Sequence, residues 1–214
     1  MPALKLYYSP GACSLAPHIL LNDLKLDYEA IQAKDRSTPE YFAINPKRQV
    51  PVFAIDNEFI TEAPGVSTAI AQLAPASRHL LGKTPLETVR VYEWLNYLSG
   101  TLHGKVYGAL FGPARFSDDE SAREGIKARG LLNAKASYAF VESQLKGSYA
   151  VGEQFTVVEP YFVVFYLWGK EVGLEIEKDY PKYTALVKRL LERESVRQTL
   201  EEEGLTERVY GTKA

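Results

Sequence analysis

The chain has 214 residues, enough for one large domain or two smaller ones, and 46% of them are hydrophobic. Its 25 Lys and Arg nearly balance its 27 Asp and Glu, so composition gives no basic face for nucleic acid or an anionic membrane. No apolar run approaches the ~20 residues that span a bilayer, and the N-terminus leads into a predicted strand, not a signal peptide. We therefore expect a cytosolic protein.

Cysteine and histidine are scarce in this chain. The single cysteine, Cys13, excludes an intramolecular disulfide and agrees with a reducing compartment. The three histidines, His18, His79 and His103, have no metal-ligand spacing, with or without Cys13. We expect no metal and no cofactor.

The first predicted elements are a strand over residues 4–9 and a helix that begins just after it. Residues 4–9 are apolar and aromatic, and Pro-Gly then ends the strand. With Ser14 as N-cap, Pro17 falls in the first helical turn, where its missing N–H is tolerated. Cys13 therefore lies at a helix N-terminus, where free N–H groups and the helix dipole favour a thiolate and lower the cysteine pKa from ~8.5 toward neutrality.

The position of Cys13 leaves two readings open. A lone cysteine is more often a small buried apolar residue than a reactive one. A thioredoxin-type dithiol site needs a second cysteine three residues on, where this chain has Ala16. Any thiol partner of Cys13 must therefore come from outside the chain.

The remainder of residues 1–75 continues the pattern βαβαββα. A second strand soon after the first helix makes a right-handed βαβ unit with parallel strands. Asp56 and Asn57 are residues favoured in a two-residue hairpin turn. The predicted elements are a strand at 26–31, a helix at 38–45, strands at 52–55 and 58–60, and a helix at 64–73.

A segment rich in Pro, Gly and Ser, residues 74–85, interrupts the periodicity and marks a domain boundary. The predicted domains are residues 1–77 and 86–205. The second domain has no alternating stretch and is predicted to be all-α. Its predicted helices are 86–111, 118–145, 157–172, 180–192 and 195–203.

Three further places carry groups suited to a binding site. Val50-Pro51 lies at the start of a predicted strand. A cis peptide bond there would leave the backbone groups of Val50 free to pair with an extended peptide. The alternative is an ordinary proline on an edge strand. Glu62 and Ala63 begin a helix, where N–H groups accept a carboxylate and Glu62 itself suits an ammonium; simple capping is the alternative.

Asn96 and His103 form the third place. They are seven residues apart and lie on one face of the predicted α-helix, two turns apart, among apolar residues. A lone histidine on such a helix is more often a satisfied core or surface group than a catalyst.

Taken together, these residues resemble a known family over essentially the whole chain. The segments YYSPGACSLAPHI, NPKRQVPVF, ITEAPGVSTAIAQLA and EWLNYLSGTLHGK closely resemble the beta class of cytosolic glutathione transferases. The resemblance implies a thioredoxin-like N-terminal domain, an all-helical C-terminal domain, and a homodimer that binds glutathione between the two domains. Glutathione is then a co-substrate.

The resemblance also implies roles for individual residues. Cys13 faces the glutathione sulfur, with Ser14 and His103 stabilising the thiolate. Val50 pairs with the cysteinyl unit, Glu62 and Ala63 hold the γ-glutamyl end, and either Lys34 or Arg36 contacts the glycine carboxylate. The expected glutathione-binding residues are Cys13, Lys34, Arg36, Val50, Pro51, Glu62, Ala63, Asn96 and His103. The expected hydrophobic acceptor site consists of Tyr107, Leu110, Phe111 and Phe116.

The chain departs from the family pattern at several positions. Arg48 stands where Gly is frequent, Ala63 where Ser or Gly is frequent, and Gly104 where Lys usually follows the histidine. The buried cap motif near Thr156 ends in Glu159, not Asp. The expected activity is glutathione transfer to small hydrophobic electrophiles, with glutathione-dependent peroxide or disulfide reduction as a side activity. The alternative is a binding or assembly module without turnover.

Overall fold

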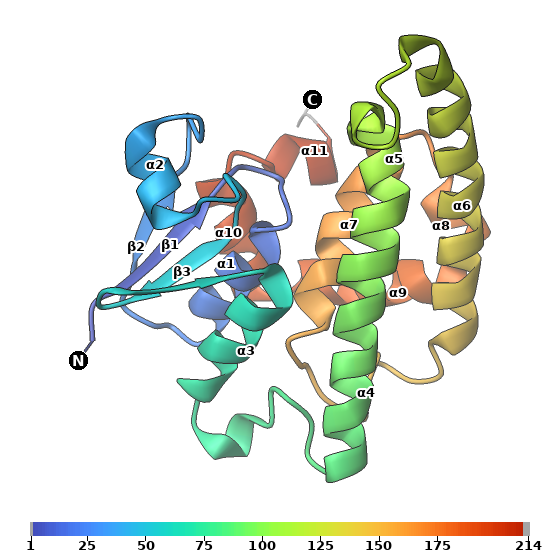
Figure 1. The fold of residues 1–214 in the computed structure, drawn as a ribbon. Helices are drawn as coiled ribbons and strands as arrows, with labels where there is room; N and C mark the ends of the chain where they lie inside the picture. Colours follow the sequence, from blue (N-terminus) through green and yellow to red (C-terminus); the bar gives the residue numbers. More distant parts are fainter. Residues whose placement is uncertain (1, 212–214) are drawn as a thin grey trace.

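The computed structural model describes residues 2–211 and places a four-stranded sheet beside a set of packed helices (Figure 1). The strands are β1 (Leu4–Tyr8), β2 (Glu29–Gln32), β3 (Val52–Ile55) and β4 (Glu58–Thr61), in the order β2-β1-β3-β4. β1 pairs with β2 in parallel, and β1–β3 and β3–β4 are antiparallel. The predicted βαβ unit and hairpin are both confirmed.

Three helices accompany the sheet: α1 (Leu15–Asp23), α2 (Pro39–Ile44) and α3 (Ala63–Gln72). α1 packs against α3 and also against α7 and α10 of the helical part. Every α1 residue from Leu15 to Asn22 is consequently buried, polar ones included. A helix buried all round must satisfy its polar side chains within the protein.

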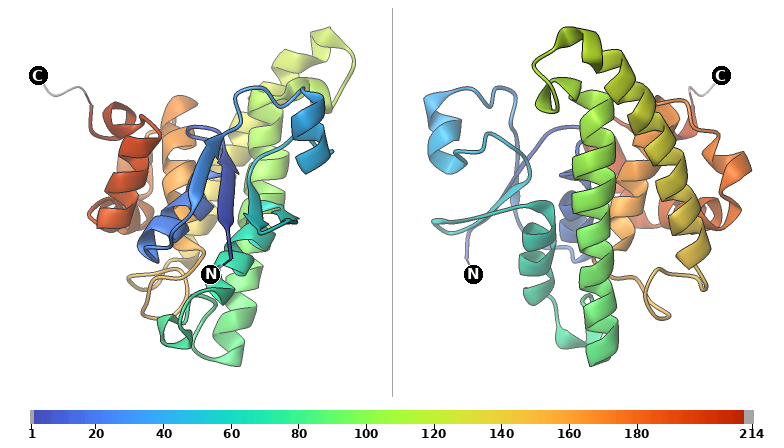
Figure 2. Two further views of the ribbon diagram at one scale, coloured as in Figure 1. Left: turned by 90° about the vertical axis from the view of Figure 1, so that its left-hand side faces the viewer. Right: turned by 45° about the vertical axis from the view of Figure 1, so that its right-hand side comes forward.

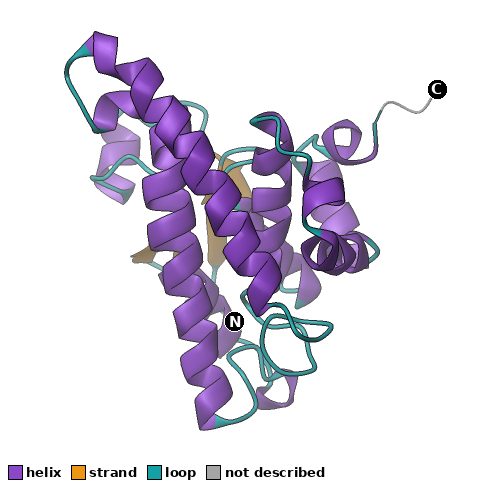
Figure 3. Ribbon diagram, turned by 90° about the vertical axis from the view of Figure 1, so that its right-hand side faces the viewer, coloured by secondary structure: helices purple, strands orange, loops and turns teal. Residues whose placement is uncertain are grey.

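The helical part is confirmed as all-α in the described residues, with more and shorter elements than predicted. Its helices are α4 (Pro85–Asn96), α5 (Gly108–Phe111), α6 (Arg123–Gln144), α7 (Glu159–Glu171), α8 (Ile176–Asp179), α9 (Pro181–Leu191), α10 (Glu194–Glu202) and α11 (Thr206–Tyr210). Short 3₁₀ turns, η1, η3 and η4, occupy 76–78, 113–115 and 120–122. Figures 2 and 3 show α6 lying alongside the long rod that begins with α4. α8 and α11 escaped prediction because four or five residues are too short for helical periodicity to register.

The helix predicted over 86–111 is one continuous rod, but an 11-residue stretch of it is not α-helical. Between α4 and α5 the chain forms a π-helical segment, η2 (Tyr97–Tyr107). Its i→i+5 hydrogen bonds widen each turn, so the residues that share a face are spaced differently from those in an α-helix. His103 lies within this segment.

The start of α7 is fixed by the cap motif that ends in Glu159. The Glu159 carboxylate accepts hydrogen bonds from the backbone N–H and the hydroxyl of Thr156 and from the N–H of Ala150. Burial raises the pKa of Glu159. The longer Glu side chain therefore forms the buried cap in place of Asp.

The larger of two hydrophobic core clusters formed by the described residues runs through both parts of the chain, from Leu4 and Leu6 of the sheet to Leu200 and Leu205. We retain the division into residues 1–77 and 86–205 as a proposal, with the segment between them as the connection. None of the helices within residues 2–211 combines the length and apolar character that a membrane-spanning helix requires.

Candidate active site

A small cavity of about 80 Å³ lies where the N-termini of α1 and α3 face the π-helical segment. Four stretches of chain contribute to it: the start of α1, the turn before β3, the start of α3, and the helical part. Its lining residues are Cys13, Asn45, Gln49, Val50, Pro51, Glu62, Ala63, Pro64, Ser99, His103 and Tyr161. Residues that are distant in the sequence thus meet at the junction of sheet and helices.

Cys13 lies in this cavity as a neutral thiol. Its side chain donates a hydrogen bond to the carbonyl oxygen of Val50 at 3.3 Å, and the residue is 7% exposed. Burial raises the pKa of Cys13 to about 12, although the N–H groups of Cys13 and Ser14 lower it. The expectation of a pKa near neutrality is wrong, because loss of water around the sulfur outweighs the helix N-terminus.

Ser14 is the N-cap of α1, as predicted, but its side chain does not cap the helix. The hydroxyl accepts from the N–H of Ser9 at 3.1 Å and donates to the carbonyl of Ser9 at 3.2 Å. Ser14 is fully buried and is not part of the cavity lining. What it offers the cavity is its backbone N–H, since the hydroxyl holds the end of β1.

The two predicted backbone features at the cavity are present. Val50-Pro51 is a cis peptide bond, and the Val50 carbonyl faces Cys13. Glu62, immediately before α3, has φ +65°, a conformation that favours glycine and costs a non-glycine residue of order 1–3 kcal/mol. Its carboxylate is paired with Lys47, and Ala63 beside it is 7% exposed.

His103 reaches the cavity from the helical part, but Asn96 does not line it. Burial lowers the pKa of His103, and the positive charge of Arg115 adds to this, so the ring is neutral at pH 7. Asn96 is exposed and donates to the carbonyl of Tyr92 at 2.7 Å. Ser99, four residues before His103, lines the cavity with it, because four residues make about one helical turn. The wider π turns take a residue seven positions away, such as Asn96, off this face.

The two candidate basic residues, Lys34 and Arg36, are both exposed and lie outside the cavity lining. Arg36 is nevertheless near enough that its positive charge acts to lower the pKa of Cys13. Of the two, Arg36 is thus the one whose charge reaches the Cys13 end of the cavity.

The predicted acceptor residues divide into exposed and buried ones. Phe111 and Phe116 are 49% and 50% exposed, and Leu110 is half-buried. The expectation for Tyr107 is wrong, because this side chain is 1% exposed and its hydroxyl is hydrogen-bonded to that of Tyr138. Phe111 packs on Trp168, which in turn packs on His103, so an aromatic surface continues from the cavity toward Phe111.

Sequence reasoning missed five lining residues of different character: Asn45, Gln49, Pro64, Ser99 and Tyr161. Gln49 lies in the NPKRQVPVF segment, next to the predicted Val50, so its position was a usable signal. Ser99 lies four residues, about one helical turn, before the predicted His103, so its spacing was a usable signal as well. Tyr161 belongs to an almost wholly apolar helix, so the sequence pattern predicts that its ring packs in the hydrophobic core.

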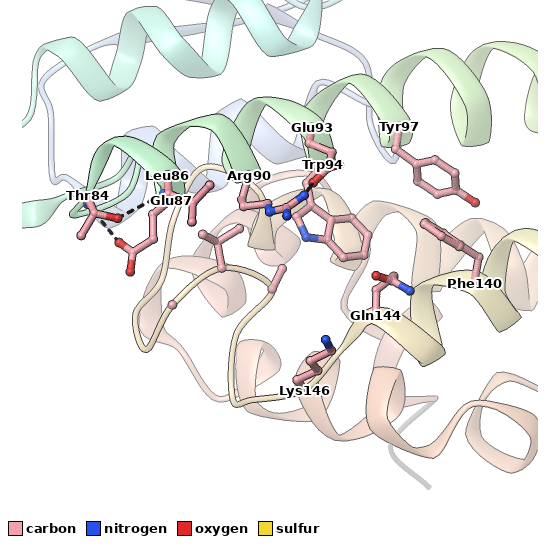
Figure 4. A pocket seen from close by; sticks show the side chains of 13 residues that line it. Thr84, Leu86, Glu87, Arg90, Glu93, Trp94, Tyr97, Phe140, Gln144 and Lys146 are labelled. Carbon is pink, nitrogen blue, oxygen red and sulfur yellow. Dashed lines mark hydrogen bonds and ion pairs between the residues drawn. The ribbon is translucent and has the colours of Figure 1, made fainter.

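A second, larger cavity of about 610 Å³ lies elsewhere, between α4, α6 and residues 146–152. In Figure 4, Trp94 and Tyr97 extend toward this cavity from the rod that begins with α4, and Phe140 and Gln144 extend toward it from α6. None of the predicted site residues lines it. Within the described residues, no cluster of His, Cys, Asp and Glu is suited to hold a metal ion.

Comparison with known proteins agrees with this geometry over nearly the whole chain. The family models "Glutathione S-transferase, N-terminal domain" and "Glutathione S-transferase, C-terminal domain" match residues 2–72 and 114–194. Glutathione S-transferase GstA of Escherichia coli O157:H7 is 31% identical over 94% of this chain and its own full length.

Two solved structures are similar in both sequence and fold. A glutathione transferase homologue from Sulfitobacter with bound glutathione is 28% identical, with a TM-score of 0.89, covering 96% of this chain and 100% of that one. The beta-class glutathione S-transferase of Sphingomonas chungbukensis is 29% identical, with a TM-score of 0.81, covering 94% of this chain and 99% of that one. The chain belongs to the glutathione S-transferase family, and its resemblance to the beta class is confirmed.

Proposed function

We propose that this protein conjugates reduced glutathione to small hydrophobic electrophiles. One observation carries the proposal: Cys13, the cis Val50-Pro51 turn and Glu62 share one cavity with His103 of the helical part. The Sulfitobacter homologue, which has this fold, holds glutathione. The cavity is much smaller than the 300–1,000 Å³ of drug-sized sites, so it fits the sulfur end of the tripeptide while the remainder lies along the open surface.

The chemistry follows from the groups around the sulfur. Glutathione's thiol would lie next to Cys13, where the N–H groups of Cys13 and Ser14 favour a negative sulfur. Neutral His103 is able to accept the thiol proton. The thiolate then attacks the electrophilic carbon, a C–S bond forms, and the leaving group departs with its electron pair.

The charged ends of glutathione meet groups of opposite sign in this proposal. Glu62 attracts the γ-glutamyl ammonium, and the N–H groups at the start of α3, beginning with Ala63, receive the γ-glutamyl carboxylate. Arg36, whose field reaches Cys13, takes the glycine carboxylate. The acceptor would contact the exposed rings of Phe111 and Phe116, with Leu110 beside them.

Thiol–disulfide exchange is proposed as a side activity that uses Cys13 directly. The Cys13 thiolate attacks one sulfur of glutathione disulfide, a mixed disulfide forms, and one glutathione leaves as thiolate. The high pKa of Cys13 makes this slow at neutral pH. The same site would support glutathione-dependent peroxide reduction.

We further propose a homodimer and a cytoplasmic location. Apolar side chains on the outside of α4 and α6 support the dimer, since they suit burial against a second copy. They are Leu86, Val89, Tyr92, Leu132 and Phe140. Light scattering is expected to give twice the chain mass; a stable monomer with normal glutathione binding contradicts the dimer. The single unpaired cysteine supports the location.

Turnover of a generic aromatic halide with glutathione tests the activity, together with calorimetric titration of glutathione. We expect binding and enzyme-dependent conjugation. Binding without turnover, on halide, epoxide and unsaturated carbonyl acceptors alike, supports a binding or assembly module. Absence of glutathione binding contradicts both.

A further inference from the structure

Four tyrosines of the helical part are almost completely buried: Tyr107, Tyr138, Tyr161 and Tyr183. Three of them have partnered hydroxyls. Tyr138 donates to the carbonyl of Phe165 at 2.5 Å, Tyr183 to the carbonyl of Phe162 at 2.6 Å, and Tyr107 is bonded to Tyr138 at 2.7 Å. The Tyr161 hydroxyl has no hydrogen-bond partner among the described residues. A buried hydroxyl without a partner is costly, so this one requires an explanation.

The place of Tyr161 supplies that explanation. The residue lies in the first turn of α7, is 0% exposed, and lines the small cavity with Cys13 and His103. Burial raises the pKa of Tyr161 well above its ordinary value, and the negative charge of Glu62 raises it further. Its O–H group is therefore intact at neutral pH and is available as a hydrogen-bond donor.

The other hydroxyl and thiol donors near Cys13 are either occupied or in contact with water. The Ser14 hydroxyl is occupied by Ser9, and the Cys13 thiol donates to Val50. Ser99 also brings a hydroxyl to the lining, but it is only half-buried, and water competes for its bonds. A fully buried O–H donor interacts more strongly with a negative atom than one in contact with water.

We propose that Tyr161 is a catalytic residue whose hydroxyl donates a hydrogen bond to the sulfur of glutathione bound beside Cys13. The inference rests on the proposed transferase function and adds a group to that site. The bond involves no proton transfer: the O–H proton stays on Tyr161, and the thiol proton passes to His103, as in the proposed function. Because the bond is stronger to the thiolate than to the thiol, it favours the reactive form of the substrate.

Tyr161→Phe removes this oxygen and little else, and Tyr183→Phe is the matched control. The pKa of bound glutathione is read from thiolate ultraviolet absorbance during a pH titration; Cys13, with a pKa of about 12, does not interfere below about pH 10. We expect Tyr161→Phe to raise the pKa of bound glutathione by about one unit and to lower kcat/KM about tenfold at pH 6.5, with recovery at high pH. Its Tm should equal or exceed that of the wild type, because an unpartnered hydroxyl is lost.

Tyr183→Phe should behave in the opposite way, with a lower Tm and an unchanged glutathione pKa, since its hydroxyl bonds a core carbonyl. A Tyr161→Phe enzyme with the wild-type pH profile would overturn the inference while leaving the proposed function intact. The inference would also be overturned if Ser99→Ala raised the pKa of bound glutathione and Tyr161→Phe did not. Wild-type protein that binds no glutathione would overturn the inference and the proposed function together.

Discussion

α1 separates two buried polar regions that are organised in opposite ways. At its N-terminus, the cavity holds an unpartnered hydroxyl on Tyr161 and a strained backbone at Glu62. Toward its C-terminus, His18 Nδ1 and the Asn22 amide are hydrogen-bonded to side chains of α10 and of Glu203 just after it, and of their polar atoms only His18 Nε2 lacks a hydrogen bond among the described residues. Unmet polar groups are costly and indicate a place for a ligand, whereas satisfied ones hold elements together.

The second region is a buried link between α1, α10 and the loop that carries Cys13. His18 is 0% exposed; its Nδ1 donates to Glu203 at 2.8 Å, and its Nε2 lies 3.2 Å from Glu202. The other oxygen of Glu203 accepts the N–H of Gly11 at 2.8 Å. We call His18, Glu202, Glu203 and Gly11 the α1–α10 link, and expect it to act on stability.

The largest expected effect is therefore the loss of His18. His18→Ala leaves the Glu203 carboxylate buried with one partner fewer, and breaking such a pair costs about 3–5 kcal/mol of unfolding free energy. Urea unfolding measures it. His79→Asn is the control, since His79 has φ +46°, which Asn tolerates, and should cost less than about 1 kcal/mol. If His18→Ala has the stability of the wild type, the α1–α10 link does not stabilise the fold.

The next effect concerns the free Cys13 thiol. Burial raises its pKa from 9.0 to about 12, so its thiolate fraction at pH 7 is about a thousandfold lower than that of an unperturbed cysteine. Iodoacetamide should alkylate Cys13 slowly, with a rate that still increases at pH 10. A plateau near pH 8 or below would mean that the helix N-terminus outweighs burial.

Cys13→Ala tests which sulfur the cavity serves. Conjugation should survive substantially, because glutathione supplies its own thiolate, whereas disulfide exchange should be lost. Intact mass should show a reducible one-glutathione adduct on the wild type after treatment with glutathione disulfide. Loss of both activities would make Cys13 the obligatory nucleophile, and an adduct on Cys13→Ala would refute the mixed-disulfide assignment.

His103→Ala should lower kcat/KM about 100-fold, within the range for loss of a general base. Because burial keeps the pKa of His103 below 6.5, wild-type activity should not fall through protonation of this ring until the pH is below that value. Activity is compared per folded molecule with that of His18→Ala, which should change less. Equal, negligible effects of both changes would remove His103 from the site.

The smallest effect distinguishes the two basic residues. Arg36→Ala should raise the KM for glutathione about tenfold at low salt, since its charge reaches the cavity. Lys34→Ala should change it less than twofold. Added salt should reduce the difference in KM between the two variants, because both residues are exposed and their charges are screened. The reverse ranking would assign the glycine carboxylate to Lys34.

Much of this arrangement could be predicted from the sequence, because turn chemistry is local. Local signals indicated a helix start or a turn at three points: Pro-Gly before Cys13, Val50-Pro51, and the start of α3. The structure brings these points together around one cavity. The parallel pairing of β1 with β2 and the β3–β4 hairpin followed from local patterns, whereas the pairing of β1 with β3, which joins the two units, was not predicted.

The rest depended on tertiary context that no local pattern contains. Asn96 was placed by α-helical geometry, whereas the chain winds as a π-helix directly after it. Tyr107 and Tyr161 are both aromatic residues near the site, but only packing decides that one is core and the other lines the cavity. Burial likewise reversed the expected direction of the Cys13 pKa.

Gly11 is held on both sides by side chains of the helical part. Its N–H is bonded to Glu203, 192 residues away, and its carbonyl accepts the indole N–H of Trp168 at 2.8 Å. Its φ of +69° suits glycine and turns the chain toward Cys13. Local opening at the end of α10 would thus free the Gly11 N–H while Trp168 still holds the carbonyl, so amide hydrogen exchange at Gly11 should proceed at the opening rate of the C-terminal helices. The C-terminal helices thereby control how often one of the two anchors of the Cys13 loop is lost.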